Sequence, residues 1–280
     1  MNENLLEINN LSVHFPTEEG LVHAVEQNSF SIKKGETIGI VGESGSGKSI
    51  TALSIMQLLP NVAKMPSGQI QFSKEDGQTI DLVKLDQKKI EQVRGKEIAM
   101  IFQEPMTSLN PVITCGQQVT EAIQLHQKKT FVQAKQATLK LFREVKLPDV
   151  ERIFSAYPHQ LSGGQKQRIM IAMALSCQPK LLIADEPTTA LDVTVQKSIL
   201  NLLNELRSTY QLSILFISHD LGVIRSIADR ILVMQKGKIV ESGTVEAIFK
   251  KAKHPYTKGL LACRPSINQH LKRLPTIENF

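Results

Sequence analysis

The chain has 280 residues, 41% of them hydrophobic and 21% charged, which is enough for one or two globular domains. No apolar run approaches the roughly 18 residues that a membrane-spanning helix needs, and the N-terminus lacks the basic-then-apolar order of a signal peptide, so we expect a cytoplasmic protein. The net charge of +6 is spread among acidic residues, which argues against a nucleic-acid partner. Cys115, Cys177 and Cys263 lack CxxC spacing, which argues against a zinc site or a disulfide framework.

The N-terminal part of the chain has the pattern of strands. Residues 5–41 contain two short runs in which apolar and polar residues alternate, and they end in a continuous apolar strand at 37–41. Glycines and a helical pattern that starts near Lys48 come directly afterwards. This order predicts a strand, a loop and a helix in succession.

The middle of the chain changes to a helical pattern, from about residue 105 to 175. Two apolar strands at 181–185 and 213–218 follow, separated by a helix-like stretch at 193–210. Strands that alternate with helices predict a parallel sheet with crossover helices. We therefore expect an α/β fold whose mainly parallel sheet is flanked by helices, with an N-terminal antiparallel β region and an inserted helical subdomain at about 104–170.

A glycine-rich segment between the first apolar strand and its helix fits the pattern GxxxxGK[ST], at 42–49. Glycines let successive backbone N–H groups converge on phosphate oxygens, the lysine reaches the β- and γ-phosphates, and the last hydroxyl is available to Mg²⁺. A chance match is expected in roughly one chain per hundred of this length, before the flanking strand and helix are required. The candidate phosphate-binding residues are Gly42, Ser44, Gly45, Gly47, Lys48 and Ser49.

Two carboxylates, Asp185 and Glu186, end the apolar strand at 181–185. Ligands of parallel α/β sheets lie beyond the carboxyl ends of the strands, so this pair is expected to face the phosphates. Asp185 is then the candidate Mg²⁺ partner, and Glu186 is placed to polarise an attacking water. An acidic pair after a strand is weak evidence alone, because Asp commonly begins turns.

His219 follows the strand at 213–218 and therefore lies at the same sheet edge. Its imidazole could donate a hydrogen bond to a γ-phosphate oxygen. The residue means little by itself, and Asp220 is equally well placed to cap the next helix.

A second helix start, Leu161-Ser162-Gly163-Gly164-Gln165, also has the features of an anion site. Ser162 with Gln165 makes a capping box, which is sufficient reason for both residues. A cap alone gains nothing from two glycines in the first turn, where each costs up to about 1 kcal/mol relative to alanine. The chain thus carries two phosphate-binding helix starts, and one nucleotide does not obviously need both.

These motifs together resemble ATP-binding cassette (ABC) ATPase subunits. GESGSGKS, Gln103, LSGGQ, LLIADEP, the ALD at 190–192 and His219 occur in the order and approximate spacing of that family, over residues 5–265. LSGGQ downstream of a P-loop is the specific element. The resemblance implies one ABC ATP-binding domain over residues 1–265, followed by a tail at 266–280.

The resemblance also implies roles that the residues alone do not show. Two subunits of the family pair head to tail, so that LSGGQ of one closes over ATP held by the P-loop of the other, with Asp192 at the seam. The catalytic set is then Glu186, His219 and Gln103, which lies near Mg²⁺ and the membrane-domain contact, and the cofactors are ATP and Mg²⁺. Phe15 or a neighbour lies against adenine, although the family more often has Tyr there, and a Phe in an alternating strand is more often core.

The resemblance narrows to the peptide/nickel uptake branch through QEPMTSLNP at 103–111 and HPYT at 254–257. Many members of that branch continue with a cysteine-containing segment, whereas this sequence ends after RLPTIENF at Phe280. Either that segment is absent, or the chain belongs to a longer polypeptide with a second cassette.

The sequence favours one of three functions. The favoured one is an ATPase subunit on the cytoplasmic face of the membrane that energises import of di- or oligopeptides or a related small ligand. Its partners are permease subunits, a second ATP-binding subunit and, indirectly, an extracytoplasmic binding protein. A soluble ABC ATPase acting on DNA or ribosomes usually carries coiled coils, zinc modules or a duplicated cassette, and none appears here. A non-hydrolysing module should have lost Lys48, Glu186 or His219, and all three are present.

Overall fold

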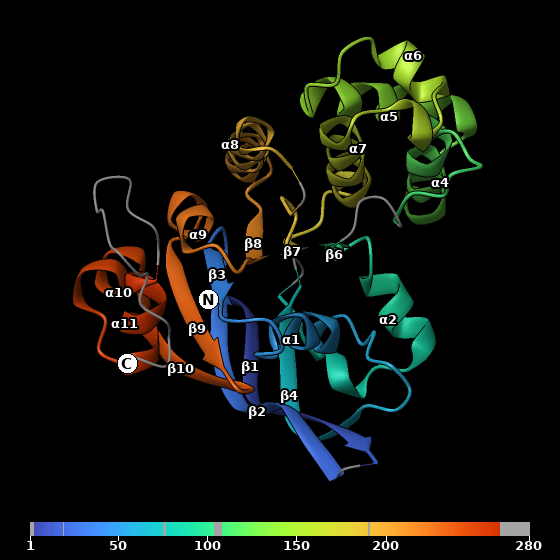
Figure 1. The fold of residues 1–280 in the computed structure, drawn as a ribbon. Coiled ribbons are helices and arrows are strands. Elements are labelled where there is room, and N and C mark those ends of the chain that lie inside the picture. Colours follow the sequence, from blue (N-terminus) through green and yellow to red (C-terminus); the bar gives the residue numbers. More distant parts are fainter. Residues whose placement is uncertain (1–2, 19, 75–76, 104–107, 190, 264–280) are drawn as a thin grey trace.

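The computed structural model describes residues 3–18, 20–74, 77–103, 108–189 and 191–263, and two sheets form its framework (Figure 1). The larger sheet has the order β10-β9-β3-β8-β7-β6. All its neighbours are parallel except β10, which runs antiparallel to β9. Its strands are β3 (Thr37–Val41), β6 (Ile98–Ile101), β7 (Leu181–Asp185), β8 (Ser213–Ile217), β9 (Arg230–Gln235) and β10 (Lys238–Thr244).

The smaller sheet is antiparallel and has the order β2-β1-β4-β5. The expected N-terminal antiparallel region is therefore confirmed, and the two alternating runs form its first two strands, which pair as a hairpin and are somewhat longer than expected. β4 and β5, which follow the P-loop helix in the chain and complete this sheet, were not expected. The strands are β1 (Asn4–Thr17), β2 (Gly20–Lys33), β4 (Lys64–Ser73) and β5 (Thr79–Asp81).

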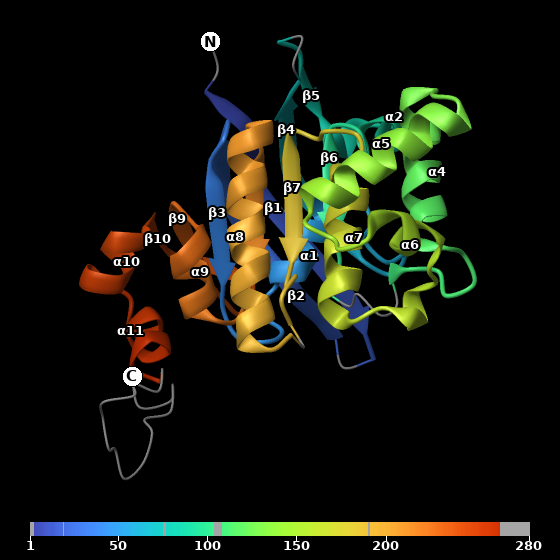
Figure 2. The same cartoon turned by 90° about the horizontal axis from the view of Figure 1, so that it is seen from above.

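Two hydrophobic cores lie on the two faces of the larger sheet. In β7 the odd residues Leu181 and Ile183 belong to one core, and the even residues Leu182 and Ala184 belong to the other. This alternation explains why the strand reads as a continuous apolar run, since both faces are buried. Figure 2 shows helix α8 (Val193–Tyr210) on one side of the sheet and the P-loop helix α1 (Lys48–Ile55) on the other.

The inserted helices form a lobe beside the β6 end of the sheet (Figure 1). They are α4 (Cys115–Gln127), α5 (Phe131–Glu144), α6 (Val150–Ser155) and α7 (Gly163–Leu175). Each begins at a side chain that accepts a backbone N–H of its first turn, which is the usual reason for a helix start: Thr114, Thr130, Asp149 and Ser162. The expected inserted helical subdomain is confirmed, and its last helix, α7, ends at Leu175, where the helical pattern of the sequence was expected to end.

Shorter elements complete the chain, and within the described residues no helix is both long and apolar enough to cross a bilayer. The predicted boundary at residue 265 and the stretch 104–107 lie outside the described residues. The remaining elements are η1 (Leu82–Lys84), α2 (Gln87–Val93), η2 (Pro158–Gln160), α9 (Leu221–Ile227), α10 (Val245–Lys251) and α11 (Pro255–Ala262).

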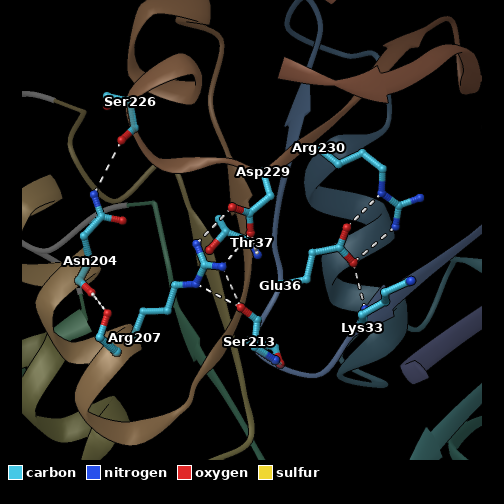
Figure 3. A network of polar contacts seen from close by, with 11 residues as sticks. Lys33, Glu36, Thr37, Asn204, Arg207, Ser213, Ser226, Asp229 and Arg230 are labelled. Atoms are coloured by element: carbon cyan, nitrogen blue, oxygen red, sulfur yellow. Dashed lines mark hydrogen bonds and ion pairs between the residues drawn. The ribbon is translucent and has the colours of Figure 1, made fainter. Parts of the chain in front are cut away.

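A polar network ties α8 to the amino ends of the central strands (Figure 3). The Arg207 guanidinium donates to the Gly35 carbonyl at 2.6 and 2.9 Å and to the Asp229 carboxylate at 2.6 Å. Asp229 also accepts the backbone N–H of Thr37, the first residue of β3, at 2.8 Å. This network lies at the sheet edge opposite to the P-loop, so it stabilises the framework without touching the candidate site.

We expect Asp229→Ala to lower the free energy of unfolding by about 1–3 kcal/mol. The backbone N–H of Thr37 and the Arg207 guanidinium each lose a carboxylate acceptor in this variant. Denaturant unfolding of the two proteins measures the difference. Glu205→Ala is the control, since it removes the exposed ion pair with Lys146, for which a loss under about 1 kcal/mol is expected. Equal losses in the two variants would contradict a structural role for Asp229.

Candidate nucleotide-binding site

The P-loop connects β3 to α1 and is held by close backbone contacts. Gly47, which begins the helix, has a φ of +101°, and a Cβ there would lie 2.2 Å from the carbonyl oxygen of Ala24 in β2. A Cβ on Gly42 would lie 2.2 Å from the carbonyl oxygen of Met234 in β9. Both glycines are therefore required by packing, while Ser44 and Gly45 form the exposed tip of the loop. No side chain caps α1, so the N–H groups of its first turn remain available to bind an anion.

Lys48 is only 5% exposed, and its Nζ donates at 2.8 Å to the carbonyl oxygens of both Gly42 and Glu43. Burial lowers the pKa of Lys48, and the nearby carboxylates Glu186 and Asp185 partly oppose that effect. A buried ammonium of this kind is stabilised by additional negative charge. The lysine is thus suited to bind phosphate oxygens.

Asp185 meets the P-loop directly, because the Ser49 hydroxyl donates to its Oδ1 at 3.1 Å. Burial raises the pKa of Asp185, the Ser49 hydrogen bond opposes this, and the neighbouring charge of Glu186 raises it further. A hydroxyl and a carboxylate at this separation are hard oxygen donors of the kind that Mg²⁺ prefers, and a cation would relieve the cost of the buried charge. The pair therefore fits a Mg²⁺ site.

Three predicted catalytic side chains converge at one oxygen. Glu186 has a φ of +46°, and its side chain is 12% exposed. Its Oε2 lies 3.1 Å from His219 Nδ1 and accepts a weak 3.4 Å hydrogen bond from Gln103 Nε2. Thr189, which was not predicted, donates its hydroxyl to the same oxygen at 2.9 Å. The available signal was its position three residues after the carboxylate, which is within reach across a turn.

The LSGGQ segment begins α7 on the helical lobe, and its capping box is confirmed. The Ser162 side chain accepts the Gln165 N–H at 3.3 Å, and Gln165 Oε1 accepts the Ser162 N–H at 3.0 Å. Gly164 has a packing reason, because a Cβ there would lie 2.8 Å from Val195 of α8, whereas a Cβ on Gly163 meets only an ordinary 3.4 Å contact. Internal packing therefore accounts for one of the two glycines.

Two further predicted site residues, Asp192 and Phe15, make contacts within the chain itself. Asp192 caps α8 by accepting the Val195 N–H at 2.9 Å, and Asp220 similarly caps α9. Phe15 in β1 is half-buried against the hydrophobic core that also contains Leu181 and Ile183, and it lies opposite Val22 of β2. The roles of Asp192 at a dimer seam and of Phe15 at adenine stay predictions.

A P-loop that faces a strand-end carboxylate pair across a mainly parallel sheet defines the fold class of P-loop nucleoside triphosphatases. Residues 25–189 match the family model described as ABC transporter. Residues 240–279 match the model described as Oligopeptide/dipeptide transporter, C-terminal region. The chain belongs to the ABC transporter family, and the predicted resemblance to its peptide-uptake branch is confirmed.

Curated relatives agree with this assignment. The chain is 53% identical over 262 residues to the peptidoglycan transport ATP-binding protein YejF of Agrobacterium fabrum, which covers 93% of the chain and 47% of the relative. It is 48% identical to the glutathione import ATP-binding protein GsiA of Escherichia coli, over 94% of the chain and 42% of that relative. A putative peptide import ATP-binding protein of Brucella melitensis is 47% identical, covering 98% and 81%. The chain thus spans less than half of the first two relatives.

Solved structures show the same architecture. A dimeric post-hydrolysis state of the ATP-binding cassette MJ0796, bound to ADP and Pi, has a TM-score of 0.75 at 27% identity and covers 86% of this chain and 98% of its own. The cbiO1 protein of Clostridium perfringens, part of the cbiONQ transporter complex, has a TM-score of 0.73 at 27% identity, covering 89% and 92%. The predicted cassette fold is therefore confirmed.

Proposed function

We propose that this chain binds Mg-ATP and hydrolyses it as one half of a head-to-tail dimer, whose closure energises import of di- or oligopeptides or a related small ligand. The observation that carries this proposal is the 3.1 Å hydrogen bond between Ser49 of the P-loop and Asp185 of β7. It joins the phosphate-binding loop to the strand-end carboxylates, so Glu186, the next residue, lies beside the same site. The family assignment and the confirmed cassette fold support the proposal.

Each residue of the site has a chemical role in this proposal. Lys48 and the N–H groups at the start of α1 bind the phosphates, while Ser49 and Asp185 hold Mg²⁺, which neutralises phosphate charge when bound. Glu186 accepts a proton from the attacking water. Gln103, Thr189 and His219 orient that carboxylate, since all three contact its Oε2.

The second phosphate-binding helix start is assigned to a partner subunit's nucleotide. Ser162 and the P-loop lie on different parts of the chain, one at the start of α7 in the helical lobe and the other between β3 and α1 (Figure 1). Head-to-tail pairing brings two such segments over one nucleotide, which gives both phosphate-binding features of the chain a function. The dimeric state of the MJ0796 cassette supports the pairing of two subunits.

Ser162→Arg tests the composite site. We expect the variant to bind ATP nearly normally, because its own P-loop is intact, but to fail to form an ATP-dependent dimer and to lose hydrolysis. A bulky cation at this position obstructs closure over a partner's γ-phosphate. Nucleotide titration, size-exclusion chromatography with ATP and phosphate release measure the three properties.

Thr130→Arg is the matched control, since Thr130 caps α5 with the same capping box, formed with Gln133. Both variants lose a cap, typically worth about 1 kcal/mol of stability, but only Ser162 lies in LSGGQ. A folded, monomeric Ser162→Arg protein that hydrolyses ATP at the wild-type rate would show that Ser162 does not reach a partner's nucleotide.

The transport function rests on the C-terminal match and on the relatives' names, which favour import over action on nucleic acid or ribosomes. The partners are then membrane permease subunits, with the chain bound to them at the cytoplasmic face, and a binding protein that delivers the ligand. Copurification of the complex identifies these partners. Screening of di- and oligopeptides for stimulation of its ATPase activity identifies the ligand class, and a complex that responds to none of them would contradict peptide import.

A further inference from the structure

The C-terminal helix α11 reaches the P-loop through one tyrosine. Tyr256 is 4% exposed, and its hydroxyl oxygen accepts the backbone N–H of Glu43 at 3.0 Å. The two residues are 213 positions apart in the chain. Tyr256 lies within the segment that matches the oligopeptide-transporter C-terminal model, so a part of the chain outside the cassette motifs contacts the phosphate-binding loop.

The Glu43 N–H belongs to the same peptide group as the Gly42 carbonyl. That carbonyl oxygen accepts the Lys48 ammonium at 2.8 Å, so one peptide plane is held between the Tyr256 hydroxyl and the Lys48 Nζ. Hydrogen bonds on the two ends of one peptide group polarise each other. Any rotation of this peptide would move the Gly42 carbonyl oxygen, which accepts a hydrogen bond from the ammonium group of Lys48.

The position of Tyr256 is itself fixed by β10. The Glu241 carboxylate accepts the backbone N–H groups of Lys253 and His254 at 2.7 and 3.1 Å, and His254 Nδ1 accepts the N–H of Tyr256 at 3.2 Å. Burial alone would raise the pKa of Glu241, but the hydrogen bonds to its carboxylate lower it, so the carboxylate is charged at neutral pH. α11 therefore starts at a defined place beside the P-loop.

We infer that Tyr256 is a positioning residue for nucleotide binding: its hydroxyl holds the peptide between residues 42 and 43 so that the carbonyl stays directed at Lys48. Through this contact the C-terminal segment sets the affinity of the P-loop for ATP, an inference that rests on the proposed ATPase function. Burial also raises the pKa of Tyr256, which keeps the phenol neutral at physiological pH. A neutral hydroxyl is the state that accepts a backbone N–H without adding a charge beside the phosphates.

Tyr256→Phe tests the inference, because it keeps the buried ring and removes only the acceptor of the Glu43 N–H. We expect the Kd and KM for Mg-ATP to rise about three- to tenfold, the range that corresponds to losing one hydrogen bond. We expect kcat at saturating ATP to stay near the wild-type value, since Glu186 and its partners are untouched. Binding of a fluorescent ATP analogue and steady-state phosphate release give the two quantities.

Tyr210→Phe is the matched control. It also removes one partly buried tyrosine hydroxyl, which donates to Glu144 between α8 and α5. This control is expected to leave Kd and KM unchanged. A general loss of packing would instead lower Tm in both variants without a selective change in KM.

A Tyr256→Phe protein with wild-type Kd and KM would overturn the inference while leaving the proposed function intact. A wild-type chain that neither binds nor hydrolyses ATP would overturn both. Should Tyr256→Phe fail to fold, His254→Ala provides a second variant, since it keeps the hydroxyl and weakens only the start of α11. A smaller rise in Kd is expected for it, and an unchanged Kd would count against the inference.

Discussion

Replacing Glu186 with glutamine is expected to lower ATP turnover by roughly 10²–10⁴-fold, the usual cost of losing a general base. The amide keeps the shape of the side chain, and its oxygen can still accept from Thr189 and Gln103. ATP should still bind, because Lys48, Ser49 and Asp185 are unchanged. Single-turnover hydrolysis and nucleotide titration separate these effects, and a stable ATP-loaded dimer should accumulate on size-exclusion chromatography.

Glu205→Gln is the control for this substitution, because it removes an exposed carboxylate that pairs with Lys146. Its turnover should equal that of the wild type. If Glu186→Gln instead lost nucleotide affinity while turnover per bound ATP stayed normal, Glu186 would be a binding residue and the assigned base would be wrong.

Lys48→Ala should weaken nucleotide binding and abolish measurable turnover. The ammonium is buried and held at 2.8 Å by two P-loop carbonyls, so its removal takes away the positive charge that stabilises the β- and γ-phosphates. Burial lowers the pKa of Lys48 and the nearby carboxylates oppose that effect, so the negative charge of a bound phosphate would further stabilise the buried ammonium. Isothermal titration with Mg-ATP and phosphate release measure the two losses.

Two controls accompany this variant. Lys48→Met keeps much of the buried aliphatic stem and separates loss of charge from loss of packing; both variants should be inactive. Lys89→Ala removes an exposed lysine on α2 and should be neutral. Hydrolysis at the wild-type rate by Lys48→Ala would refute the assignment of the loop at 42–49.

The elements that were predicted well are those whose signal is local. β3 and β7 are continuous apolar runs because both of their faces are buried, and α8 combines a helical period with a capping aspartate at residue 192. The strands β4, β5, β6, β9 and β10 were not predicted. β4 pairs with β1, which lies far before it in the chain, and β10 is an edge strand without a buried residue.

The residues of the candidate site can also be separated into those with a local sequence signal and those whose contacts depend on the tertiary structure. The residues of GESGSGKS, of LSGGQ and of the acidic pair after β7 could be identified from the sequence, because each motif is a strand end or a helix start with its own chemistry. The placement of the P-loop, the acidic pair and His219 at one sheet edge was expected too, because the carboxyl ends of parallel strands lie together. The individual contacts were not: Gln103, Thr189 and His219 all reach the Oε2 atom of Glu186, and Thr189 does so across a turn.

The sequence by itself determined the family and the candidate residues for binding phosphate and Mg²⁺ and for activating water, because these depend on residue types at short spacing. Only the tertiary structure decided which residues support that chemistry from a distance. Gly47 must lack a side chain because the Ala24 carbonyl abuts it, and Tyr256 reaches the Glu43 N–H from 213 residues away. Contacts of this kind leave no periodic signal, since they depend on how the sheets and the C-terminal helix pack.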